Sequence, residues 1–163
     1  MRVTARQILN LYLTLTVLST FSVSFIWGIN TLFLLDAGLS ITGAFAANAF
    51  FTVGQVFFEV PTGVVADTFG RRVSYLLGAL TLLLSKALYL LLWKIEGPFW
   101  AWATTSVVLG LGFTFFSGAT EAWLVDALNF ADYRGTFDAA FAKGQIAGGI
   151  AMLVGTVSGG VVA

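Results

Sequence analysis

The sequence contains no cysteine and no histidine, and only 10% of its 163 residues are charged. These absences remove disulfides, a thiolate nucleophile, the Ser-His-Asp triad and the commonest zinc and haem ligands. Eight Lys and Arg balance eight Asp and Glu, so the chain has neither a basic field for nucleic acid nor an acidic tail. We therefore expect a protein that is not an enzyme, holds no metal or cofactor, and binds no nucleic acid.

The chain is instead rich in long apolar runs. Hydrophobic residues make up 58% of it and the mean hydropathy is +0.93, which is more apolar surface than a small soluble domain can bury. A helix needs roughly 20 apolar residues to cross a bilayer core, and five stretches reach that length, at residues 9–35, 41–66, 73–93, 99–127 and 141–163. The sequence predicts an all-α polytopic membrane protein, with one helix bundle over residues 1–163 and no soluble domain.

The short connections carry most of the basic residues on one side. That side holds Arg2, Arg6, Arg71, Arg72 and Arg134, and the other side holds Lys94. Because cytoplasmic loops retain Lys and Arg, we expect a multi-pass protein of the cell (inner or plasma) membrane, with a cytoplasmic N-terminus. An aromatic belt is expected at the opposite face, from Trp93, Trp100 and Trp102.

A polar stripe runs along the second predicted span. Asn48, Thr52, Gln55 and Glu59 follow one another at steps of four, three and four, which places them on one helical face. A carboxylate at the bilayer centre costs about 2.5 to 3.5 kcal/mol, so Glu59 is a functional candidate. The stripe either lines an aqueous cavity or hydrogen-bonds a neighbouring helix, and Pro61 is expected to bend or weaken the helix beside it.

Other spans also carry polar residues. Glu121 in the fourth span shares a face with Ser117, and it either binds a proton or a cationic substrate or forms an ion pair inside the bundle. Lys86 in the third span either extends toward the outer surface or contacts substrate. In the first span a candidate cavity face recurs at three-residue steps, formed by Ser24, Trp27 and Asn30.

Glycines are concentrated in the fifth predicted span, at Gly144, Gly148, Gly149, Gly155, Gly159 and Gly160. Small residues four positions apart let two helix backbones approach closely in lipid. We interpret Gly155 and Gly159 as packing residues rather than as part of a ligand site.

The turn after the second span reads G-V-V-A-D-T-F-G-R-R over residues 63–72. Glycines permit a tight turn, and a carboxylate and a guanidinium can join two helix ends by charge-assisted hydrogen bonds. This turn resembles the G-x-L-A-D-R-x-G-R-K motif of the major facilitator superfamily, which lies between the second and third helices there. The matches are Gly63, Ala66, Asp67, Gly70 and Arg71, with Arg72 as a basic equivalent, and the departures are Val65 and Thr68.

The resemblance implies that Asp67 and Arg71 latch a cytoplasmic gate and that Arg71 pairs with Asp126 of the fourth span. It also implies that this chain corresponds to the first five of twelve helices, an incomplete N-terminal bundle. Further C-terminal helices or a second half would then complete the transport path. In that family the substrate site lies between the halves, which rock against each other.

Two weaker resemblances concern substrate and coupling. Residues 155–160, G-T-V-S-G-G, are similar to the G-P-x-x-G-G motif of drug/proton antiporters, with Thr156 in place of proline. Ser117-Gly118 resembles part of a proton-coupling motif in which Thr114 replaces the arginine. The resemblance implies secondary active efflux of a small organic or amphipathic compound. Coupling through the family's arginine does not carry over to this chain, and Glu59 or Glu121 is the candidate proton carrier instead, because each is a carboxylate within a predicted span. The alternative is a non-transporting scaffold or assembly subunit, whose glycine faces bind other helices.

Overall fold

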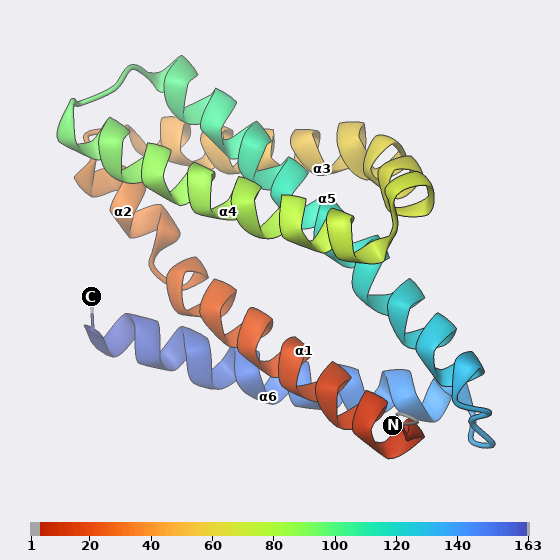
Figure 1. Cartoon of the computed structure of the whole chain (residues 1–163). Helices are drawn as coiled ribbons and strands as arrows, with labels where there is room; N and C mark the ends of the chain where they lie inside the picture. The colour runs from red at the N-terminus through yellow and green to blue at the C-terminus, as the bar shows by residue number, and fades with distance from the viewer. Residues whose placement is uncertain (1–3, 163) are drawn as a thin grey trace. The chain divides into compact units, whose positions relative to one another are not determined.

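The computed structural model describes residues 4–162, except for the side chains of residues 117 and 118. Within that range all regular structure is helical, with no strand (Figure 1). The helices are α1 (Ala5–Trp27), α2 (Asn30–Asp36), α3 (Ile41–Phe69), α4 (Arg71–Lys94), α5 (Phe99–Phe130) and α6 (Phe137–Val162). Five helical stretches are long and apolar enough to cross a membrane, with α1 and α2 together forming the first. The prediction of an all-α fold with five stretches of membrane-spanning length and apolarity is confirmed for the described residues.

Local capping chemistry fixes several helix ends. At the start of α1, the Thr4 hydroxyl accepts the Gln7 amide proton at 3.4 Å, and the Gln7 side-chain oxygen accepts the Thr4 amide proton at 2.9 Å. This reciprocal pair is a capping box. At the start of α3, the Ser40 hydroxyl accepts the amide proton of Gly43 at 3.1 Å. Each cap satisfies backbone donors that have no partner inside the helix.

The first span is broken in two at Gly28 and Ile29, which form a turn between α1 and α2. Gly28 also lies close to α6, because a Cβ there would come within 3.0 Å of Thr156 Cγ2 and 3.3 Å of its carbonyl oxygen. Hydropathy predicted one uninterrupted span, since a two-residue turn does not lower the average. Glycine has low helix propensity, which makes this position an accessible place for the interruption.

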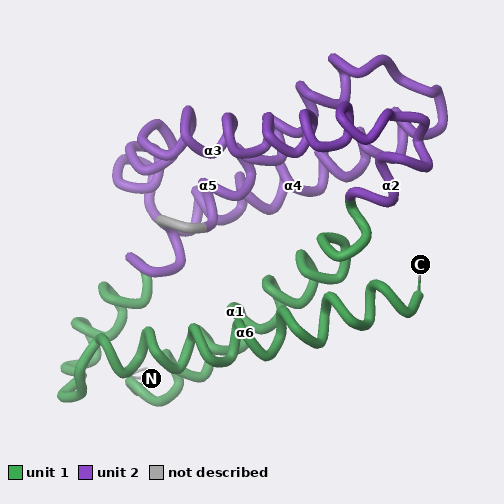
Figure 2. The backbone as a smooth tube through the Cα atoms, turned by 180° about the vertical axis from the view of Figure 1, so that it is seen from behind, with its two compact units in different colours: residues 1–30, 123–163 green, residues 31–122 purple. Residues whose placement is uncertain are grey.

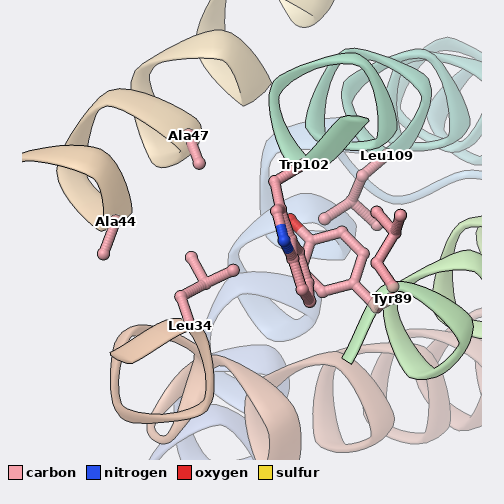
Figure 3. Packing of buried hydrophobic residues seen from close by; sticks show 7 residues of the cluster. Leu34, Ala44, Ala47, Tyr89, Trp102 and Leu109 are labelled. Atoms are coloured by element: carbon pink, nitrogen blue, oxygen red, sulfur yellow. The ribbon is translucent and has the colours of Figure 1, made fainter. Parts of the chain in front are cut away.

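The chain divides into two units, coloured separately in Figure 2. Unit 1 comprises residues 1–30 and 123–163, and unit 2 comprises residues 31–122. Unit 1 is built around the buried side chains of Ile8, Tyr12, Leu124, Leu128 and Ala140. Unit 2 is built around Leu34, Ala44, Ala47, Tyr89, Leu92, Trp102 and Leu109, most of which are labelled in Figure 3. One boundary falls between residues 30 and 31, at the start of α2, and the other falls within α5, between residues 122 and 123.

In unit 1, α1 and α6 pack side by side through glycines. A Cβ at Gly155 would lie 2.8 Å from the carbonyl oxygen of Phe21, and a Cβ at Gly159 would overlap the carbonyl oxygen of Phe25. The helix backbones are therefore in direct contact at two points four residues apart. This is the packing role that the sequence predicted for these two glycines.

In unit 2, α5 lies directly against α3. A Cβ at Gly54 would lie 2.9 Å from the Cα of Val107, and one at Gly110 would lie 2.9 Å from the backbone nitrogen of Gln55. Large apolar side chains cover the opposite surfaces of α3 and α4 and are exposed, among them Val56, Phe57, Val60, Leu80 and Leu83. In a bilayer such surfaces face acyl chains.

Candidate functional site

The turn between α3 and α4 brings Asp67 and Arg71 together. Asp67 lies in the last turn of α3 and Arg71 is the first residue of α4, and Arg71 Nη1 donates to Asp67 Oδ1 at 2.6 Å. The Asp67 side chain is 70% exposed and that of Arg71 is 29% exposed. This charge-assisted bond spans the junction of the two helices and remains accessible to solvent or to another partner.

A single residue, Gly70, connects α3 to α4. Its φ is 90° and its ψ is 154°, a backbone conformation that is essentially restricted to glycine. The backbone conformation therefore requires a glycine at position 70 of the motif. Gly63, the first glycine of the motif, differs, because a Cβ there would meet no described atom within 4 Å.

The remaining motif residues are exposed. Arg72 is exposed at the start of α4, and Asp126 is exposed on α5. Asp126 belongs to unit 1, whereas Arg71 belongs to unit 2. The pairing of Arg71 with Asp126 stays a prediction.

The two ends of the polar stripe on α3 differ in their burial. Asn48 is half-buried and its Nδ2 donates to the Thr31 hydroxyl of α2 at 3.3 Å. Gln55 is half-buried next to α5, whereas Thr52 and Glu59 are exposed. One end of the stripe therefore joins neighbouring helices and the other end is open. The helix continues through Pro61 to Phe69, so the proline does not terminate it.

Two exposed carboxylates lie deep within membrane-length helices. Glu59 is ten residues from the end of α3 at Phe69, and Glu121 is nine residues from the end of α5 at Phe130. At 1.5 Å per residue these positions are about 15 and 14 Å from the helix ends. Carboxylates at that depth face water or polar partners rather than acyl chains. The Ser117-Gly118 pair that resembles a coupling motif lies outside the described side chains.

The predicted cavity face of the first span is not continuous. Ser24 is 2% exposed and Asn30 is 9% exposed, whereas Trp27 between them is 49% exposed. Ser24 and Trp27 both belong to α1, so a spacing of three residues within one helix does not place them on one buried face here. The turn at Gly28 and Ile29 separates Asn30 from both. Asn30 is a buried residue at the first position of α2.

A cluster that sequence reasoning missed lies in unit 2 between α2, α4 and α5. Lys86 Nζ sits 5.3 Å from the ring centroid of Tyr89, whose hydroxyl hydrogen-bonds to the Ser106 hydroxyl at 2.8 Å. Trp102 meets the Tyr89 ring edge to face with ring centroids 5.4 Å apart, and Phe33 packs on both rings. Figure 3 labels Tyr89 and Trp102 within the buried cluster. The three-residue spacing of Lys86 and Tyr89 on one helix was a usable signal.

The aromatic belt expected around the loop after α4 is only partly correct. Trp93 and Trp100 are exposed, but Trp102 is fully buried and its Nε1 donates to the carbonyl oxygen of Gly97 at 3.0 Å. Trp102 is a core residue because its indole nitrogen finds a partner inside unit 2. Trp93 Nε1 donates to Asp36 Oδ2 at 2.9 Å and thereby links the ends of α2 and α4 beside an open recess of about 870 Å³.

These features define the class: a multi-pass helical membrane protein with a charged turn between two spans and polar groups within them. Among the described residues no group of three or more acidic side chains is arranged to hold a metal ion. No protein family, curated protein or solved structure matches the chain.

Proposed function

We propose that the chain forms part of the N-terminal half of a secondary transporter of the major facilitator type. In this proposal it exports a small organic or amphipathic compound by alternating access. The observation that carries the proposal is the ion pair between Asp67 and Arg71 across the single glycine that joins α3 to α4. It occurs within the sequence segment that resembles the family's gate motif.

The pair has the properties that a gate requires. An exposed ion pair stabilises its geometry by only about 0.2 to 1 kcal/mol, so it can be broken and remade in every transport cycle. Arg71 can then exchange Asp67 for a second carboxylate, for which we propose Asp126. A conformational equilibrium shifts only by the difference in interaction energy between its states, and exchange of carboxylates supplies such a difference.

The proposal also says which residue carries the proton and which part of the transport path this chain does not supply. We assign the proton to Glu59 or Glu121, because both are exposed at membrane depth. Gln55 and Asn48 lie on the same face as Glu59 and would line the polar path. The wall opposite this chain would come from further helices or a second half, with the substrate bound near the bilayer midplane.

The experiment measures transport in membrane vesicles from cells that express the chain. Uptake of an amphipathic fluorescent dye into inverted vesicles under a pH gradient is compared between wild type and Asp67→Asn. The variant keeps the size of the side chain and removes its charge, so we expect flux to fall by up to about fivefold, the change that corresponds to a loss of about 1 kcal/mol. Asp132→Asn is the matched control, because Asp132 is exposed in a loop at φ 49°, which asparagine also tolerates. Equal flux in Asp67→Asn and wild type would contradict the gate assignment.

One observation favours the second candidate, a scaffold or assembly subunit. On α6, a Cβ at Gly149 or Gly160 would meet no described atom within 4 Å, so these glycines form an open small-residue surface. Such a surface suits another transmembrane helix. A scaffold would carry no dye flux and would tolerate Asp67→Asn, which separates it from the transporter in the same experiment.

A further inference from the structure

Lys86 places a charged amine well inside a membrane-spanning helix. It lies eight residues before Lys94, the last residue of α4, or about 12 Å along the helix axis. A lysine at such a depth needs a compensating group, and in membrane proteins such residues mark substrate or ion pathways. Lys86 is half-buried, so it is reachable from outside the core of unit 2.

The Lys86 amine packs on an aromatic ring of its own helix. Its nitrogen lies over the ring of Tyr89, which is 3% exposed, and the Tyr89 hydroxyl is engaged with Ser106. The hydrogen bond holds the ring in a fixed orientation beneath the amine. The negative face of an aromatic ring attracts a cation, but it does not neutralise a full charge.

No carboxylate neutralises Lys86 within unit 2. Of the acidic residues described between 31 and 122, only Asp67 lies within 4.0 Å of a basic nitrogen, and that nitrogen belongs to Arg71. The positive charge of Lys86 is therefore held in place by a fixed ring and has no negative partner there. A preorganised and uncompensated cation at membrane depth is a site for an anion.

We propose that Lys86 binds the anionic group of an amphipathic organic carboxylate, whose apolar body lies along the half-buried ring of Phe33 beside Tyr89. Phe33 stacks on Tyr89 with ring centroids 6.3 Å apart, so Lys86 and Phe33 both pack on the same ring and an apolar surface belongs to the same cluster as the charge. As the substrate site of an exporter this inference rests on the proposed function. An anionic lipid headgroup shares the same chemistry and is separated from the carboxylate by the test.

The test measures binding to the purified full-length chain in nanodiscs of phosphatidylcholine. The probe is radiolabelled 4-phenylbutyrate, with 4-phenylbutyramide as the uncharged competitor of the same shape. We expect saturable binding to wild type and a preference for acid over amide. Lys86→Met should weaken binding about tenfold or more and abolish that preference, because it removes the charge-assisted contact. Lys86→Arg keeps the charge and should retain binding.

Lys94→Met is the matched control, since Lys94 is an exposed lysine of the same helix, and it should bind as wild type does. Far-ultraviolet circular dichroism confirms that all variants keep their helical content. Absence of saturable phenylbutyrate binding, wild-type binding by Lys86→Met, or equal competition by the amide would each overturn the inference. Selective retention of phosphatidylglycerol by wild type over Lys86→Met, without phenylbutyrate binding, would also overturn it, because the occupant would then be a lipid.

The two proposals fail separately. Lys86-dependent binding together with unchanged dye flux in Asp67→Asn would leave an anion site on a protein whose gate assignment is wrong. Loss of flux in Asp67→Asn without phenylbutyrate binding would support the transporter proposal and would exclude an organic carboxylate as the substrate bound at Lys86.

Discussion

At the scale of single residues, the two glycines of the α3–α4 motif differ in what the structure demands of them. Gly70 adopts φ 90° and ψ 154°, whereas Gly63 lies within α3 with open space beside it. A motif match treats the two positions alike. Backbone conformation separates them, and it assigns the requirement for glycine to Gly70.

The first expected outcome concerns Gly70→Ala. Because the native backbone lies in a region that side chains disfavour, this variant should lose about 1 to 3 kcal/mol of stability. Thermal unfolding in detergent, followed by circular dichroism, measures the loss. Gly63→Ala is the control, and it should be neutral or stabilising by up to about 1 kcal/mol, since alanine is the better helix former. Equal effects of the two variants would contradict the assignment.

The sequence predicted which charged residues are close together along the chain better than it predicted which side chains from other parts of the fold contact them. Asp67 and Arg71 are four residues apart, and the structure places them in contact at 2.6 Å. The spacing of Lys86 and Tyr89 was visible in the sequence, but the orientation of the Tyr89 ring was not, because it depends on Ser106 of another helix. Trp102 was misassigned for the same reason, since its partner at Gly97 exists only after the chain folds.

At the scale of helices, hydropathy predicted the number of spans correctly and missed the break in the first one. Average apolarity depends on composition, which the turn at Gly28 and Ile29 hardly changes. Several helix ends lie a few residues beyond the predicted spans, as with α6, which starts at Phe137 rather than at 141, whereas α3 and α5 begin at the predicted residues. Polar residues such as Asp138 and Lys143 join a helix without contributing to its apolar core.

Close packing of α1 against α6 leads to a second expected outcome. A Cβ at Gly159 would overlap the carbonyl oxygen of Phe25, a backbone atom that cannot rotate away. Gly159→Ala should therefore push the helices apart and cost about 1 to 3 kcal/mol, as overpacking does elsewhere.

Denaturant unfolding of the two variants in the same detergent compares Gly159→Ala with Gly160→Ala. The neighbouring glycine meets no described atom within 4 Å of an added Cβ, so its substitution should change stability by no more than about 0.5 kcal/mol. A tolerated Gly159→Ala would show that α1 and α6 are not in backbone contact.

At the scale of the whole molecule, five spans require that successive connections lie on alternate sides of the membrane. From the distribution of basic residues we expect Arg71, Arg72 and Arg134 on the cytoplasmic side and Lys94 on the other. α3 connects the two sides and carries an exposed threonine near each end, Thr42 and Thr68. The absence of cysteine means that one introduced thiol is the only thiol in the chain.

We therefore expect Thr42→Cys to react with a membrane-impermeant maleimide in intact cells, and Thr68→Cys to react only after permeabilisation. Both positions are exposed, share one residue type and lie on one helix, so a difference in labelling reports the side of the membrane. Wild type, which has no thiol, sets the background. The reversed pattern would invert the orientation and remove the cytoplasmic gate from Asp67 and Arg71. Labelling of both variants in intact cells would show that α3 does not cross the membrane.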